Sequence, residues 1–119
     1  LSSASAASDV YKRQASAKQL RLAAQRASTA DVTSAYYQLQ AAHLSVKAFA
    51  DAVEANELAA QGVRREQELG SRSTLDLLDA ERELLNSKVN LSTAKASLIV
   101  ANMQLDAAIG ALLPPDLAQ

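Results

Sequence analysis

Residues 69–79 read Leu-Gly-Ser-Arg-Ser-Thr-Leu-Asp-Leu-Leu-Asp, and they hold the only sharp turn signal within about ninety residues of helix-type sequence. Gly70 can adopt the left-handed conformation that ends many helices. Ser73 can cap the following helix, with Asp76 three residues later as the reciprocal acid of a capping box. The stretch therefore predicts a helix over 15–69, a turn over 70–73 that includes Ser71, and a helix over 74–112.

Apolar residues on both sides of this turn recur at alternating steps of three and four, which is the pattern of a coiled-coil seam. The first seam consists of Val32, Ala35, Leu39, Ala42, Val46, Phe49, Val53, Asn56, Ala60 and Val63. The second consists of Leu77, Ala80, Leu84, Ser87, Leu91, Ala94, Leu98, Ala101, Leu105, Ala108 and Leu112. Reflection of the chain about Arg72 places Val32 opposite Leu112, so the sequence predicts a long antiparallel helical hairpin.

The second helix carries another apolar stripe beside its seam. Its members are Leu75, Leu78, Leu85, Val89, Ala96, Ile99 and Met103. Two stripes on one helix require two neighbours, so this helix is expected to pack against a partner as well as against the first helix. Two helices alone also form only a thin core.

The composition favours long helices and excludes several kinds of site. Hydrophobic residues make up 49% of the 119 residues, whereas aromatic residues make up only 3%. A net charge of −1 gives no sign of a nucleic-acid surface. The absence of cysteine excludes disulfides and thiolate metal sites, and we expect no cofactor and no metal. No apolar run approaches the roughly 18–20 residues that a membrane-spanning helix needs.

Both ends of the chain depart from the hairpin pattern. Residues 1–14 have no heptad and no clear amphipathic face, and they are interpreted as a non-native, adapter-like segment or a disordered terminus. Residues 15–113 are assigned to the helical hairpin. Residues 114–119, which begin with two prolines, are assigned to a truncated tail.

The motif over residues 69–80 resembles the turn of the TolC family of outer-membrane channel proteins. The stretches 62–70 and 105–112 also fit that family, and the resemblance covers about residues 15–113. The resemblance implies that this segment is the helical hairpin of the family's second internal repeat. It would form part of a trimeric α-barrel in the periplasm of a Gram-negative bacterium. An outer-membrane β-barrel, formed by residues outside this segment, would join the α-barrel. The implied partners are two further copies, a periplasmic adaptor and an inner-membrane pump that drives efflux or type I secretion.

The resemblance also implies roles for individual residues at the closed periplasmic entrance. Arg72 matches an arginine that holds the entrance shut, whereas Asp76 and Asp79 match acids that line it. Gln67 stands where the family often has a gate tyrosine. Without the resemblance, Arg72 would be read as a solvated turn residue and Asp76 as a capping acid.

Two other functions stay open at this point. A periplasmic adaptor also contains a long antiparallel coiled-coil hairpin, and a soluble helical scaffold would show the same seams. Catalysis is not expected, because the sequence has no nucleophile–base pairing, no phosphate-binding glycine loop and no metal constellation.

Overall fold

A computed structural model describes residues 2–115 and 117 of the chain, so Leu1, Asp116, Ala118 and Gln119 lie outside the described residues. It contains two helices, α1 (Ser2–Glu68) and α2 (Thr74–Leu112). No strand occurs among the described residues. The all-α fold is confirmed. The sequence predicts helices over 15–69 and 74–112, and the structure ends α1 at Glu68 and has α2 over Thr74–Leu112.

The N-terminal limit of α1 differs from the expectation. The helix begins at Ser2, so residues 2–14 are helical and their interpretation as a disordered terminus is wrong for this structure. The cause is local, because the segment contains neither proline nor glycine to interrupt a helix. Its interpretation as a non-native segment stays a prediction. The assignment of 114–119 to a tail falls partly outside the described residues.

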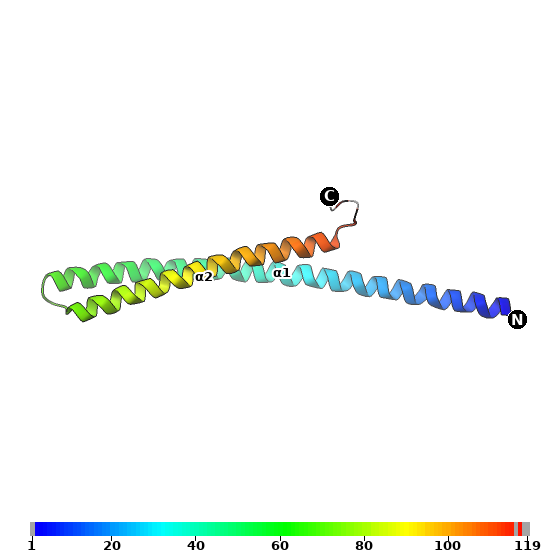
Figure 1. Ribbon diagram of the computed structural model, residues 1–119, viewed down its shortest axis with the longest axis horizontal. Coiled ribbons are helices and arrows are strands. Elements are labelled where there is room, and N and C mark those ends of the chain that lie inside the picture. Colours follow the sequence, from blue (N-terminus) through cyan, green and yellow to red (C-terminus); the bar gives the residue numbers. More distant parts are fainter. Residues whose placement is uncertain (1, 116, 118–119) are drawn as a thin grey trace. The chain divides into compact units, whose positions relative to one another are not determined.

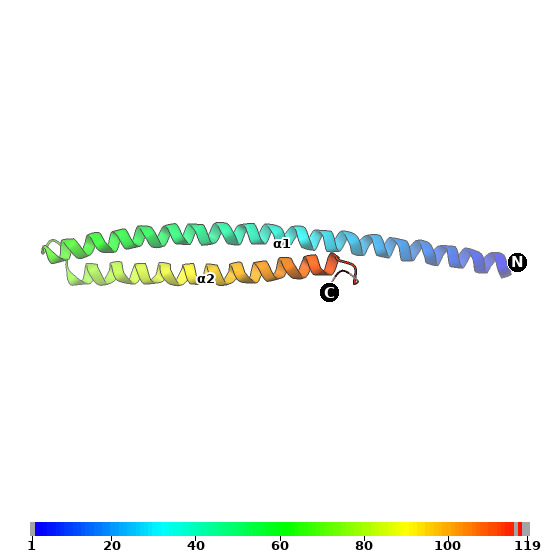
Figure 2. The ribbon, with the colours of Figure 1, turned by 90° about the horizontal axis from the view of Figure 1, so that it is seen from above.

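The chain divides into two compact units, one formed by residues 37–104 and the other by residues 1–36 with 105–119. In the first unit, residues 37–68 of α1 and 74–104 of α2 lie side by side and run in opposite directions (Figure 1 and Figure 2). Ion pairs join Glu57 to Lys88 and Arg64 to Glu81. Both pairs are centred between residues 72 and 73, half a residue from Arg72, about which the sequence predicts the chain to fold back.

The core of the hairpin consists of small side chains. The buried residues are Ala35, Ala60, Ser87, Ala94 and Ala101, and every one of them belongs to a predicted seam. The larger seam residues are half-buried or partly exposed. Small residues at these positions allow two helix axes to approach closely. The other side chains of the hairpin are only partly buried, as expected for a core that is two helices thick.

Gly70 has a φ of +81°, the only positive φ among the described residues. A Cβ there would meet no atom within 4 Å, so a side chain would cost conformational energy and cause no clash. We expect Gly70→Ala to lower the free energy of unfolding by about 1–2 kcal/mol.

Thermal unfolding followed by circular dichroism measures this change. Gly62→Ala is the matched control, because Gly62 also faces open space but lies inside α1 with helical geometry. That control is expected to stabilise the chain by up to about 1 kcal/mol. Equal effects of the two substitutions would contradict the role of Gly70 in ending α1.

Candidate functional site

The turn between α1 and α2 is built by backbone hydrogen bonds around Gly70. The Gly70 N–H donates to the carbonyl of Gln67 at 3.0 Å, and the Ser71 N–H donates to the carbonyl of Glu66 at 2.8 Å. These two bonds form a Schellman motif, which satisfies carbonyl groups at the end of α1. The tip therefore has a defined backbone geometry.

Ser73 and Asp76 form the predicted capping box at the start of α2. The Asp76 N–H donates to the Ser73 hydroxyl at 3.1 Å, and the Ser73 N–H donates to Asp76 Oδ2 at 3.3 Å. Asp76 also lies in the first turn of α2, where the helix dipole favours a negative charge. The capping role of Asp76 is thus confirmed, and its place at a pore entrance stays a prediction.

Arg72 projects from the turn and pairs with an acid of its own hairpin. Its Nε lies 2.6 Å from Glu66 Oε2, and the two side chains are 49% and 48% exposed. A pair this exposed contributes only about 0–1 kcal/mol to stability, so Arg72 can exchange this partner for another. The sequence did not predict Glu66 as a partner.

Asp79 and Gln67 lie on either side of the turn in different surroundings. Asp79 Oδ1 lies 3.8 Å from Nη2 of Arg82, which is three residues later in α2. Both side chains are largely exposed. Gln67 is half-buried and lies four residues after Val63, the last member of the first seam. The structure thus brings Arg72, Asp76, Asp79 and Gln67 to one end of the hairpin, and it does not show them acting on one another.

Two ion pairs between the helices were missed in the sequence analysis. Lys88 Nζ lies 3.2 Å from Glu57 Oε1, and Arg64 bonds to Glu81. The available signal was the presence of opposite charges at nearly equal distances in sequence from Arg72. These pairs flank the seam and support the alignment of the two helices near the tip.

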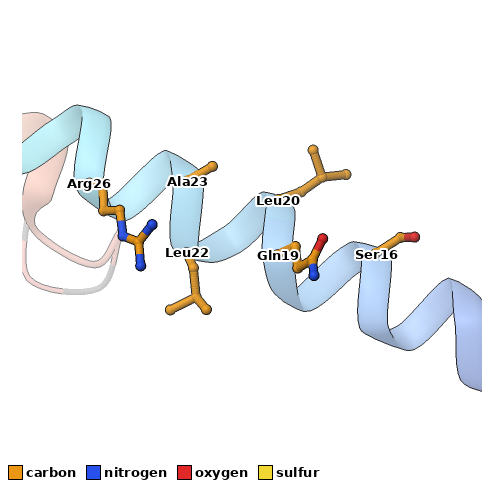
Figure 3. A pocket seen from close by; sticks show the side chains of 6 residues that line it. All are labelled: Ser16, Gln19, Leu20, Leu22, Ala23 and Arg26. Carbon is orange, nitrogen blue, oxygen red and sulfur yellow. The ribbon is translucent and has the colours of Figure 1, made fainter.

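One hollow on the surface of α1 lacks a convergent set of side chains (Figure 3). It is lined by Ser16, Gln19, Leu20, Leu22, Ala23 and Arg26. Figure 3 shows that Leu20 and Leu22 point to opposite sides of α1, so these side chains do not converge on one point. Among the described residues, no group of three His, Cys, Asp or Glu side chains could hold a metal ion. No helix there is long and apolar enough to cross a membrane.

Comparison with known proteins gives one family. The family described as outer membrane efflux protein matches residues 2–111 of the chain. The outer membrane efflux protein BepC of Brucella suis biovar 1 (strain 1330) is 39% identical over 79 residues, which cover 66% of this chain and 17% of that protein. The outer membrane protein TolC of Vibrio cholerae serotype O1 (strain ATCC 39315 / El Tor Inaba N16961) is 32% identical over 94 residues, which cover 79% and 22%.

The chain therefore spans about a fifth of the length of the curated relatives it matches. No solved structure gives a significant match.

Proposed function

Because this chain belongs to the outer membrane efflux protein family, we propose that its hairpin forms part of the periplasmic α-barrel of a trimeric outer-membrane channel. The channel passes drugs or proteins from an inner-membrane pump to the exterior. The hairpin itself catalyses no reaction and needs no cofactor, because the pump supplies the energy. The names of both relatives, which are outer-membrane proteins, support this proposal over an adaptor hairpin or a soluble scaffold.

The observation that carries the proposal is the exposed apolar stripe on α2. Its larger members are between 55% and 66% exposed, and they are Leu75, Leu78, Leu85, Val89, Ile99 and Met103. Leu44 and Leu58 are similarly exposed on α1. Contiguous apolar surface of this kind indicates a contact with another chain or segment. A closed ring of hairpins covers apolar faces on both helices, whereas an isolated hairpin leaves them in water.

The tip of the hairpin is the proposed gate at the periplasmic entrance of the channel. In the closed trimer, Arg72 contacts carboxylates of neighbouring hairpins, and Gln67 takes the place of the tyrosine that the family often has there. Asp76 and Asp79 each form a ring of three carboxylates, and such rings favour cations. Opening separates the tips, breaks the Arg72 contacts and widens the entrance. The same tip docks the periplasmic adaptor.

Chemical cross-linking and reconstitution of the full-length protein test this function. We expect a cross-linked trimer and ion-conducting pores in planar bilayers. The control is the same preparation after thermal unfolding, which should give neither result. A strict dimer, or the absence of pores from a folded protein, would contradict the proposal.

A further inference from the structure

The turn that ends α1 brings Arg72 into contact with Glu66 of its own hairpin. The Ser71 N–H donates to the Glu66 carbonyl at 2.8 Å, so the backbone doubles back onto residue 66 immediately before Arg72. Gly70 permits this reversal through its φ of +81°. The Nε of Arg72 then lies 2.6 Å from Glu66 Oε2. The contact follows from the Schellman turn, so every copy of the hairpin carries it.

Glu66 is the acid that holds Arg72 within the hairpin, because the other acids near the turn are engaged differently. Asp76 accepts a backbone N–H of the capping box at 3.3 Å. Asp79 pairs with an arginine of its own helix at 3.8 Å. Glu68, two residues after Glu66, forms no ion pair in the part of the chain that the structure describes. Any acid outside the hairpin that binds Arg72 therefore competes with Glu66.

This competition opposes the closing contact of the proposed gate. A carboxylate of a neighbouring hairpin that approaches Arg72 also approaches Glu66, and two like charges then meet at one guanidinium. Arg72 thus gives up Glu66 when it binds the neighbour, and the energy of the pair within the hairpin is lost. The two side chains are 49% and 48% exposed, so this exchange requires no unfolding of the turn.

We propose that Glu66 is a positioning residue that keeps Arg72 on its own hairpin and thereby favours the open channel. The inference rests on the proposed function, in which Arg72 closes the entrance by binding carboxylates of neighbouring hairpins. It adds a regulating contact to that gate, because the strength of one exposed ion pair sets the ratio of open to closed channels.

The test records single full-length channels in planar bilayers and measures the ratio of open to closed time. Glu66→Gln removes the charge of Glu66 and keeps its size, so it releases Arg72 toward the neighbouring hairpins. An exposed ion pair shifts an equilibrium by about two- to fivefold, and we expect the ratio to fall by that factor. Glu66→Ala also removes the acceptor oxygens and should give a fall in the same direction. A merely structural loss at the tip would loosen the entrance and raise the ratio.

Two controls assign the fall to Arg72. Glu68→Gln removes the same charge from an exposed acid near the turn, and it should leave the ratio unchanged. In the Arg72→Ser background, Glu66→Gln should have no effect, because the residue through which Glu66 acts is absent. Circular dichroism and trimer cross-linking check that each variant folds and assembles.

The outcomes separate this inference from the proposed function. An unchanged or higher ratio in assembled Glu66→Gln and Glu66→Ala trimers would overturn the inference, even where Arg72→Ser alone opens the channel. An equal fall in Glu68→Gln, or a fall of the same size in the Arg72→Ser background, would overturn it as well. If Arg72→Ser alone does not raise the ratio, the proposed gate itself fails, and Glu66 has no closing contact to oppose.

Discussion

Replacing Ala60 with leucine is expected to lower the free energy of unfolding of the hairpin by about 1–3 kcal/mol. Ala60 is 2% exposed, the lowest exposed fraction among the buried residues described. It belongs to the α1 seam at a place where the helices are held together by the pairs Glu57–Lys88 and Arg64–Glu81. A leucine side chain there must separate the two helices or adopt a strained rotamer.

The matched control is Ala59→Leu, one residue earlier in the same helix. Ala59 is exposed, so a leucine there makes the same change in helix propensity as Ala60→Leu but does not touch the seam. Urea unfolding followed by circular dichroism at 222 nm measures both variants, and Ala59→Leu should stay within about 0.5 kcal/mol of the wild type. Equal losses in the two variants would show that the seam at Ala60 is not tightly packed.

Much of the hairpin could be predicted because its signals are local or periodic. Gly70 and Ser73 fix the end of one helix and the start of the next through backbone chemistry that depends on a few neighbouring residues. The alternation of three and four residues identified the buried alanines at 60, 94 and 101 without knowledge of the partner helix. The exposed second stripe on α2 was predicted in the same way.

The remaining features depend on which side chains meet across the hairpin. Charged residues near the seam have several possible partners in sequence, and only the alignment of the helices selects Glu57 for Lys88. The pairing of Arg72 with Glu66 depends on how the Schellman turn directs residue 72 back toward α1. The start of α1 was also missed, because a segment that has no heptad but also no proline or glycine can still be helical.

Arg72 has a partner in the single chain that the resemblance does not predict. The resemblance to channel proteins directs this residue toward neighbouring hairpins, whereas in the single chain it binds Glu66 at 2.6 Å. Because that pair is half-exposed, its loss on trimer formation costs little. In the proposed closed ring, a contact with a neighbouring carboxylate would exclude more water and would therefore be stronger. Closure of the proposed gate thus requires Arg72 to exchange Glu66 for a carboxylate of a neighbouring hairpin.

Replacing Arg72 with serine is expected to increase the open fraction of the full-length channel. A hydrogen bond to a charged group contributes about 1.5–3 kcal/mol, so loss of the latch should raise the ratio of open to closed channels by tenfold or more. Serine is small and polar and fits the neighbouring Ser71 and Ser73, so the turn around Gly70 is expected to persist. Circular dichroism and trimer cross-linking check that folding and assembly are unchanged.

Lys47→Ser is the control for the loss of one positive charge, because Lys47 is exposed on α1 well away from the turn in sequence. The most direct test records single full-length channels in planar bilayers and compares the ratio of open to closed time among wild type, Arg72→Ser and Lys47→Ser. We expect a low ratio for wild type and Lys47→Ser and a ratio about tenfold higher or more for Arg72→Ser. An assembled Arg72→Ser trimer that conducts no more than the wild type would contradict the claim that the hairpin tip gates the channel.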